Sequence, residues 1–233
     1  TAMINKVWTK RIWIVTLFFF SVSSTLLKAQ QNKTPKTLVA SYFDHPVMPP
    51  FISFFKKIYK ENNIDLEVIP MPTSRGLYEV SRGSVDANII RPLSFAKNFD
   101  DIIILQPAVY RGEIVLLCHK SVTCEKSILD DPSTTVLTSI AIEATVKSMG
   151  IKANMTNYEN LESSLKMLNR NRVSYVMYGT THKFKAALEK EYNVVTLKKV
   201  IMHHVMNKKH ESLAPLIEAS IRKHLPSFDP DKR

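Results

Sequence analysis

The chain has 233 residues, of which 45% are hydrophobic and 23% are charged, with 5 glycines, 12 prolines and 2 cysteines. This is the composition of a globular protein, and it excludes an intrinsically disordered chain, a collagen-like repeat and a small domain held together by disulfides. The formal net charge is +11, and the length allows one large domain or two small ones.

Residues 1–29 have the pattern of a secretory signal peptide. Basic residues in the first eleven positions precede an apolar run over residues 12–27, and Ala29 supplies the small residue expected at a cleavage site. The run is shorter than the roughly 20 residues of a membrane-spanning helix, and a single membrane anchor is the alternative. We expect cleavage between Ala29 and Gln30, export to the periplasm, and a polar tether over residues 30–36.

Export changes both the charge and the expected partners. Residues 1–29 contain four basic residues and no acidic ones, so the formal charge of the exported chain falls from +11 to +7. Nucleic acid is not an expected partner outside the cytoplasm. The basic excess suits acidic ligands, an anionic cell envelope or solubility alone.

From Thr37 onward, short apolar runs alternate with helical periodicity. Large apolar residues between Phe51 and Tyr59 recur at helical spacing, and Pro50 suits a first helical turn. Ser74 and Gly83 are typical of a helix start and a helix stop. The first half is therefore expected to contain strands over residues 37–42, 65–70, 85–90, 101–105 and 112–120 and helices over residues 49–63 and 74–83.

The same scheme restarts in the second half. Strands are expected over residues 134–139, 173–178 and 193–197, a strand or extended link over 153–158, and helices over 140–150, 159–171, 182–192 and 211–225. This alternation predicts α/β layers with a largely parallel sheet. Residues 77–92 and 165–180 repeat one plan of helix, basic turn, strand and polar exit, which suggests two similar lobes, although every α/β protein repeats such a unit.

Cys118 and Cys124 are six positions apart. An oxidising compartment favours a disulfide between them. The alternative is two free thiols, one of them buried at the end of a strand. A metal site has little support, because only His119 lies nearby in the sequence.

The order of several segments resembles that of a known family. These segments are TLVASYFDHPVMPPF, DLEVIPMPTSRGLYEVSRGSVDANIIR, IILQPAVYRGEIVLLCHK, IAIEATVKSMG, ENLESSLKMLNRNRVSYVMYG and MHHVMNKKHESLAPLIEASIRKHL. Over residues 37–226 they resemble the extracellular solute-binding proteins of family 3, the periplasmic receptors of amino-acid ABC transporters. The single motifs are short, and their order and spacing behind a signal peptide carry the resemblance.

The resemblance implies an α/β fold of the two-lobed type II periplasmic-binding-protein class, with a hinge of two crossing strands. Lobe 1 would contain residues 37–118 and 207–233, and lobe 2 residues 119–206. The ligand would lie in the cleft between the lobes, which would close by a hinge motion. Physical reasoning agrees, because ligands of open α/β sheets bind beyond the carboxyl ends of strands and near helix N-termini.

Residues at the expected strand ends are the candidate ligand contacts. Arginine offers a rigid fork that suits a carboxylate or phosphate, whereas a surface arginine is usually a solvated charge. An aromatic residue after the first strand can form an apolar wall, although Phe43 and Phe51 could equally belong to the core. In lobe 1 the candidates are Tyr42, Phe43, Asp44, Arg75, Arg91 and Tyr110, and in lobe 2 they are Thr138, Ser139, Tyr178 and Thr180.

The sequence departs from amino-acid receptors at two places. Those receptors carry a Thr-x-x-Arg-like segment that grips the α-carboxylate, whereas this chain has Arg91-Pro92-Leu93-Ser94. They also present an aspartate from lobe 2 to the α-ammonium group, whereas this chain has Tyr178-Gly179-Thr180. Both departures speak against an α-amino acid as the ligand.

The expected function is capture of a small polar solute, anionic or zwitterionic, for ABC-type uptake through an inner-membrane permease. One alternative is a ligand-sensing accessory protein for a membrane receptor, and another is a periplasmic, dehydratase-like enzyme on the same fold. The possible acid–base groups, Asp44 with His45, Glu113, and His203 with His204, show no diagnostic spacing. The adjacent histidines would point to opposite faces of a strand. We expect a monomer with no catalytic residues, no cofactor and no metal site.

Overall fold

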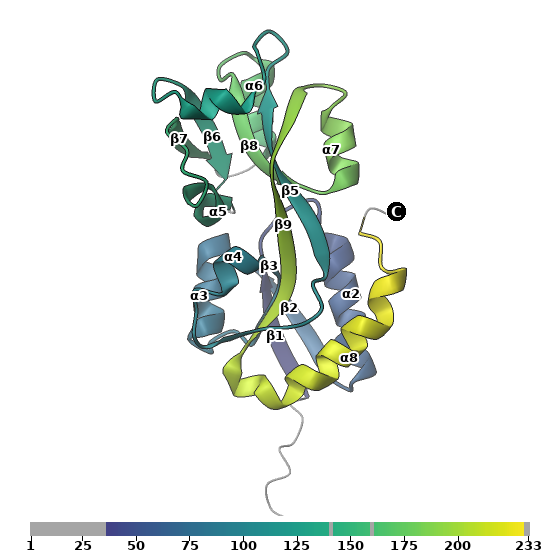
Figure 1. The fold of residues 1–233 in the computed structure, drawn as a ribbon. Helices are drawn as coiled ribbons and strands as arrows, with labels where there is room; N and C mark the ends of the chain where they lie inside the picture. Colours follow the sequence, from purple (N-terminus) through teal and green to yellow (C-terminus); the bar gives the residue numbers. More distant parts are fainter. Residues whose placement is uncertain (1–35, 140–141, 159–160, 231–233) are drawn as a thin grey trace, which may run out of the picture. The chain divides into compact units, whose positions relative to one another are not determined.

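The structure, a computed structural model, describes residues 36–139, 142–158 and 161–230 (Figure 1). The predicted signal peptide lies outside the described residues, as does all of the predicted tether except Lys36. Residues 36–233 form one compact unit. Among the described helices, none combines the length and the apolar character that crossing a membrane requires.

The first half of the chain follows the predicted order of strands and helices and adds one short helix over residues 93–96, which the sequence did not predict. Helix α2 (Met48–Glu61) buries an apolar face that includes Phe51, Phe55 and Ile58, which is why the helical spacing could be read from the sequence. The other elements are β1 (Thr37–Tyr42), β2 (Asp65–Pro70), α3 (Thr73–Ser81), β3 (Ala87–Pro92), α4 (Leu93–Ala96), β4 (Ile102–Ile104) and β5 (Tyr110–Cys118).

The second half also keeps the predicted order. Its elements are β6 (Thr135–Ser139), α5 (Glu143–Lys147), β7 (Asn154–Tyr158), α6 (Leu161–Asn169), β8 (Tyr175–Thr180), α7 (His182–Leu188), β9 (Asn193–Asn207) and α8 (Ala214–His224). Short 3-10 helices occur at Lys126–Asp130, Lys208–Leu213 and Leu225–Ser227. Residues 153–158, which were expected as a strand or an extended link, contain the strand β7.

The described strands form one mixed sheet in the order β2-β1-β3-β9-β5-β8-β6-β7, with β4 also paired to β9. The expectation of a largely parallel sheet was wrong. Each outer part of the sheet is parallel, since β1 pairs in parallel with β2 and β3, and β6 with β7 and β8. The centre is antiparallel because β5 and β9 run along each other and pair antiparallel with their other neighbours.

Strands β5 and β9 connect the two lobes of this α/β fold. Figure 1 shows them side by side between the group containing α2, α3 and α8 and the group containing α5, α6 and α7. Strand β9 has 15 residues, whereas the sequence predicted a strand only over residues 193–197. Its first part, up to Met202, pairs with β5, and its last part, from Met202 to Asn207, pairs with β3 and β4.

Separate apolar cores support the two parts of the sheet. One core gathers side chains of α2, β1, β2, β3 and α8, including Phe55, Ile58 and Ile217. Two smaller cores lie around β5, β6 and β8 and include Val136, Val176 and Met177. A ligand site between the lobes can therefore rest on two independently packed walls.

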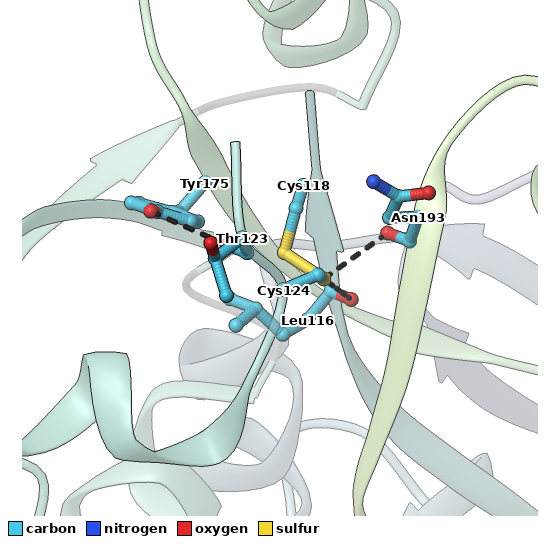
Figure 2. Close-up of a disulfide and its surroundings, with 6 residues drawn as sticks. All are labelled: Leu116, Cys118, Thr123, Cys124, Tyr175 and Asn193. Atoms are coloured by element: carbon cyan, nitrogen blue, oxygen red, sulfur yellow. Dashed lines mark hydrogen bonds between the residues drawn. A yellow bond between two sulfur atoms is a disulfide. The ribbon is translucent and has the colours of Figure 1, made fainter. Parts of the chain in front are cut away.

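A disulfide joins Cys118, the last residue of β5, to Cys124 in the following loop (Figure 2). Cys124 Sγ lies 3.4 Å from the Asn193 carbonyl oxygen at the start of β9. The Tyr175 hydroxyl donates a hydrogen bond to the Thr123 carbonyl at 3.5 Å. The bridge thus fixes the loop after β5 beside the neighbouring ends of β8 and β9.

Candidate functional site

A pocket of about 70 Å³ lies where strands of both lobes end. Its wall combines residues at the carboxyl ends of β1, β3, β6 and β8 with residues of β5, β9 and the segment leading into α5. This is the position expected of a binding site in an open α/β sheet. The lining residues are Phe43, His45, Arg91, Pro92, Ile114, Ser139, Ile142, Thr145, Tyr178, Gly179, Val200 and Met202.

Arg91 brings a positive charge to this wall. It lies near the end of β3, just after the pairing of β3 with β9 shifts its register, and its side chain is fully buried. Burial lowers the pKa of Arg91 to about 9, with no contribution from a neighbouring acid, so the guanidinium stays protonated at neutral pH. Its Nε and Nη2 atoms have no hydrogen-bond partner among the described residues. A buried charge without a countercharge is costly, which points to a ligand that supplies one.

Two neighbours position the Arg91 side chain. The Phe43 ring lies below the guanidinium, with Cζ 5.5 Å from the ring centroid, in the geometry of a cation–π contact. Gly76 of α3 also lies close to the guanidinium, since an added Cβ would come within 3.0 Å of Nη2. A larger residue at position 76 would therefore push against the arginine.

His45 and Tyr178 meet across the pocket. His45 follows β1 and Tyr178 belongs to β8, and His45 Nε2 is hydrogen-bonded to the Tyr178 hydroxyl. The two rings stack with centroids 5.2 Å apart. Burial lowers the pKa of His45 to about 4, although the Asp44 charge opposes the shift, and burial also raises the pKa of Tyr178. Both side chains are therefore neutral at pH 7.

Four of the ten predicted contacts line this pocket, namely Phe43, Arg91, Ser139 and Tyr178. Phe43 directly follows β1 and the other three lie in β3, β6 and β8, so the structure brings together strand ends that are far apart in the sequence. Phe51, the other aromatic residue considered for the wall, belongs to the core and is 1% exposed. Phe43 is only partly buried and contacts Arg91 and His45.

The other six predicted contacts lie outside the lining. Arg75 follows the start of α3 instead of a strand end, and its side chain is 68% exposed and pairs with Glu79 at 3.6 Å. Asp44 is exposed, and Tyr42 packs against the core of α2 and β1. A ligand contact for these three residues stays a prediction.

Tyr110, Thr138 and Thr180 are also absent from the lining of the pocket. The Tyr110 hydroxyl accepts a hydrogen bond from the His182 backbone N–H at 3.2 Å. The Thr180 hydroxyl donates to the Thr181 carbonyl at 3.1 Å. Thr138 is buried, and its hydroxyl has no hydrogen-bond partner within the described part of the chain. Their roles as ligand contacts also stay predictions.

Sequence reasoning named His45 only as a possible acid–base group and missed its place in the pocket. The contact with Tyr178 spans 133 positions of the chain, so no local pattern reveals it. Ile142, Val200 and Met202, which line the pocket with apolar side chains, were missed as well. The sequence does contain a signal for His45, because it directly follows the candidate contacts Tyr42, Phe43 and Asp44 at the end of the first strand.

The remaining acid–base candidates have structural partners. Glu113 lies 3.1 Å from Lys185 Nζ and accepts a hydrogen bond from the Thr196 hydroxyl at 2.9 Å. Burial raises the pKa of Glu113, but the bonds to Lys185 and Thr196 outweigh it and the net shift is downward. His203 donates from Nδ1 to the Leu105 carbonyl, and His204 donates from Nδ1 to the Ile89 carbonyl. The described residues contain no cluster of three or more side chains that could hold a metal ion.

The fold matches that of known binding proteins. The ancestral amino-acid-binding protein AncCDT-1, a precursor of cyclohexadienyl dehydratase, superposes with a TM-score of 0.70 at 15% identity, covering 84% of this chain and 92% of that one. A putative ABC-transporter binding component from Wolinella succinogenes in complex with lysine gives 0.68 at 12% identity, with 84% and 93% covered. The GluR0 ligand-binding core in complex with L-glutamate gives 0.67 at 14% identity, with 82% and 93% covered.

No protein-family model matches the chain, and no curated protein sequence matches it. At these identities the structural likeness establishes the fold alone. The chain has the α/β fold of two-lobed periplasmic binding proteins, with two long antiparallel strands as the connection between its lobes.

Proposed function

We propose that this protein is an exported solute-binding protein that captures a small anionic solute between its lobes and delivers it to an inner-membrane permease. The single observation that carries this proposal is the buried, uncompensated charge of Arg91 in the wall of the pocket. Export rests on the predicted signal peptide, and delivery rests on the likeness to binding components of ABC transporters.

The energetics favour an anion. Nε and Nη2 lie on one edge of the guanidinium, and a carboxylate can accept two parallel hydrogen bonds from such an edge. Hydrogen bonds to charged groups contribute about 1.5–3 kcal/mol each, and the bound anion also offsets the cost of the buried charge. Solute binding should therefore stabilise the folded protein strongly, since any ligand that binds only the folded state raises its stability.

The first test is a thermal-shift and calorimetric screen of the mature protein against small carboxylates, amino acids and amines. We expect carboxylate-bearing solutes to raise Tm and amines to have no effect. Binding of amines in preference to carboxylates would contradict the proposal.

Paired arginine variants locate the site. Arg91→Met should weaken binding of an anionic solute at least a hundredfold, which corresponds to a loss of about 3 kcal/mol. Arg91→Lys keeps the charge but loses the fork, so an intermediate loss is expected. Arg75→Met is the matched control, because Arg75 is exposed and pairs with Glu79. Equal affinities of Arg91→Met and the unmodified protein would remove Arg91 from the site.

The sensing and enzymatic alternatives differ in what happens to the solute. Mass spectrometry of solute recovered after incubation would reveal an enzyme by a changed mass, whereas a binding protein returns it unchanged. A sensor would share the same pocket and the same Arg91 dependence, and capture of a receptor instead of a permease would distinguish it.

A further inference from the structure

The polar side chains that line the pocket include several hydrogen-bond donors, and the described lining contains no acidic side chain. Among the lining residues that the structure describes, Arg91, His45, Ser139, Thr145 and Tyr178 are polar, and none is an aspartate or glutamate. The nearby acid, Asp44, is exposed and lies outside the lining. An ammonium group would lose its water here without gaining a carboxylate partner, which is unfavourable.

The hydrogen bonds of His45 fix its tautomer. The Val47 backbone N–H donates to His45 Nδ1 at 3.2 Å, so Nδ1 must be the ring nitrogen without a hydrogen. In the neutral ring the hydrogen then lies on Nε2. The contact between Nε2 and the Tyr178 hydroxyl is therefore one in which His45 donates and the Tyr178 oxygen accepts.

This assignment leaves the hydroxyl hydrogen of Tyr178 available. A phenol can accept one hydrogen bond and donate another. The described residues offer no acceptor for the donated bond, although Tyr178 is 2% exposed. Because Tyr178 lines the same pocket as Arg91, its hydroxyl can donate to an anion that pairs with Arg91.

The rest of the wall is apolar and the space is small. Phe43, Ile114, Ile142, Val200 and Met202 supply hydrocarbon surface. A cavity needs about 10–15 Å³ of this kind of volume for each water, so roughly five heavy atoms fit. Inorganic oxoanions would leave this hydrocarbon unused, whereas a short organic acid would cover it.

We propose that the solute is a small monocarboxylate without an ammonium group, held by Arg91 and by the Tyr178 hydroxyl, with His45 as the positioning residue for that hydroxyl. This inference rests on the proposed function and narrows it. The carboxylate accepts from Nε and Nη2 of Arg91 and from the Tyr178 O–H. The hydrocarbon part of the solute packs against Phe43 and the aliphatic side chains.

The first arm of the test compares solutes that differ only in the amino group. Calorimetry of the mature protein uses acetate against glycine and propanoate against alanine. We expect each carboxylate to bind at least tenfold more tightly than its amino acid. If the amino acids bind more tightly and Arg91→Met abolishes this, the inference fails while the proposed function stands. If no solute binds, both fail.

The second arm tests Tyr178 and His45 with the same carboxylates. Tyr178→Phe should weaken binding about tenfold or more, with a cooperative melting transition to show that it folds. His45→Leu should cause a similar loss, and His45→Gln should restore part of it, because an amide N–H can replace the Nε2–H. A purely structural role for His45 would not show this rescue. Unchanged affinity of Tyr178→Phe would remove its hydroxyl from the site, and the first arm decides the solute class even if a variant does not fold.

Discussion

Two histidine–tyrosine pairs occupy different regions of this molecule, and their hydrogen bonds run in opposite directions. In the core beneath α2, His204 donates from Nδ1 to the Ile89 carbonyl, so Nε2 accepts from the Tyr59 hydroxyl at 2.8 Å. At the pocket, His45 accepts at Nδ1 from Val47, so Nε2 donates to the Tyr178 hydroxyl.

The two pairs differ in the partner of the tyrosine hydroxyl hydrogen. In the core pair the Tyr59 hydrogen is used within the pair, and the network is closed. In the pocket pair the Tyr178 hydrogen is left for a partner outside the pair. The same two residue types therefore build either a satisfied core contact or a pair with one hydroxyl hydrogen still available, and the backbone group at Nδ1 decides which.

The prediction with the largest expected effect concerns the dependence of stability on pH. Burial lowers the pKa of His204 to about 4, against its ordinary 6.5, although its backbone hydrogen bonds oppose the shift. The unfolded chain therefore takes up this proton first as the pH falls, and stability is lost between pH 6.5 and pH 4. From pH 7 to pH 5 the loss should be about 2 kcal/mol for His204, since one pKa unit is worth about 1.4 kcal/mol.

Denaturant unfolding of His204→Asn at pH 7 and pH 5 measures this contribution. The variant should be less stable at pH 7 but should lose about 2 kcal/mol less on acidification. His45→Asn should remove a comparable share of the pH dependence, because burial lowers the pKa of His45 to about 4 as well. Acid groups with lowered pKa values, such as Asp86, titrate below this window. An unchanged pH dependence in His204→Asn would contradict the assignment.

The second prediction concerns the core pair of Tyr59 and His204. Tyr59→Phe removes the hydroxyl and leaves His204 Nε2 buried without a donor. We expect a loss of about 1.5 kcal/mol in the free energy of unfolding, within the range for unsatisfied buried groups. Urea unfolding at pH 7 measures it, and solute affinity should not change. A loss of affinity in Tyr59→Phe would show that the core pair is coupled to the pocket.

Much of the fold could be predicted because its elements have local signatures. The helical spacing of apolar residues in α2 and the short apolar runs of β1 and β2 reflect which side chains each element buries. The length of β9 could not be predicted in this way. Its last five residues are all buried, so both faces are covered there and the sequence shows no alternation.

Residues that line the pocket could be predicted only where they lie at or near the end of a strand. Arg91 and Tyr178 satisfy that rule, and both line the pocket. Arg75 was selected by the same rule, but the chain turns into α3 at Thr73 and the side chain faces solvent beside Glu79. Pairing of His45 with Tyr178 depends on bringing two lobes together, which no local pattern specifies.

The prediction with the smallest expected effect on stability compares the two pairs most directly. Tyr178→Phe leaves the His45 Nε2–H without its acceptor, as Tyr59→Phe leaves His204 without its donor. Because the pocket can admit water to the unpaired group, we expect the solute-free protein to lose only about 0.5 kcal/mol, less than the cost for a sealed site. Urea unfolding of both variants, with and without propanoate, gives the comparison. Added propanoate should stabilise Tyr59→Phe as much as the unmodified protein and Tyr178→Phe much less, because only the latter loses a donor to the solute. Equal stabilisation of the two variants would mean that both pairs are structural, and the different tautomers would then have no functional consequence.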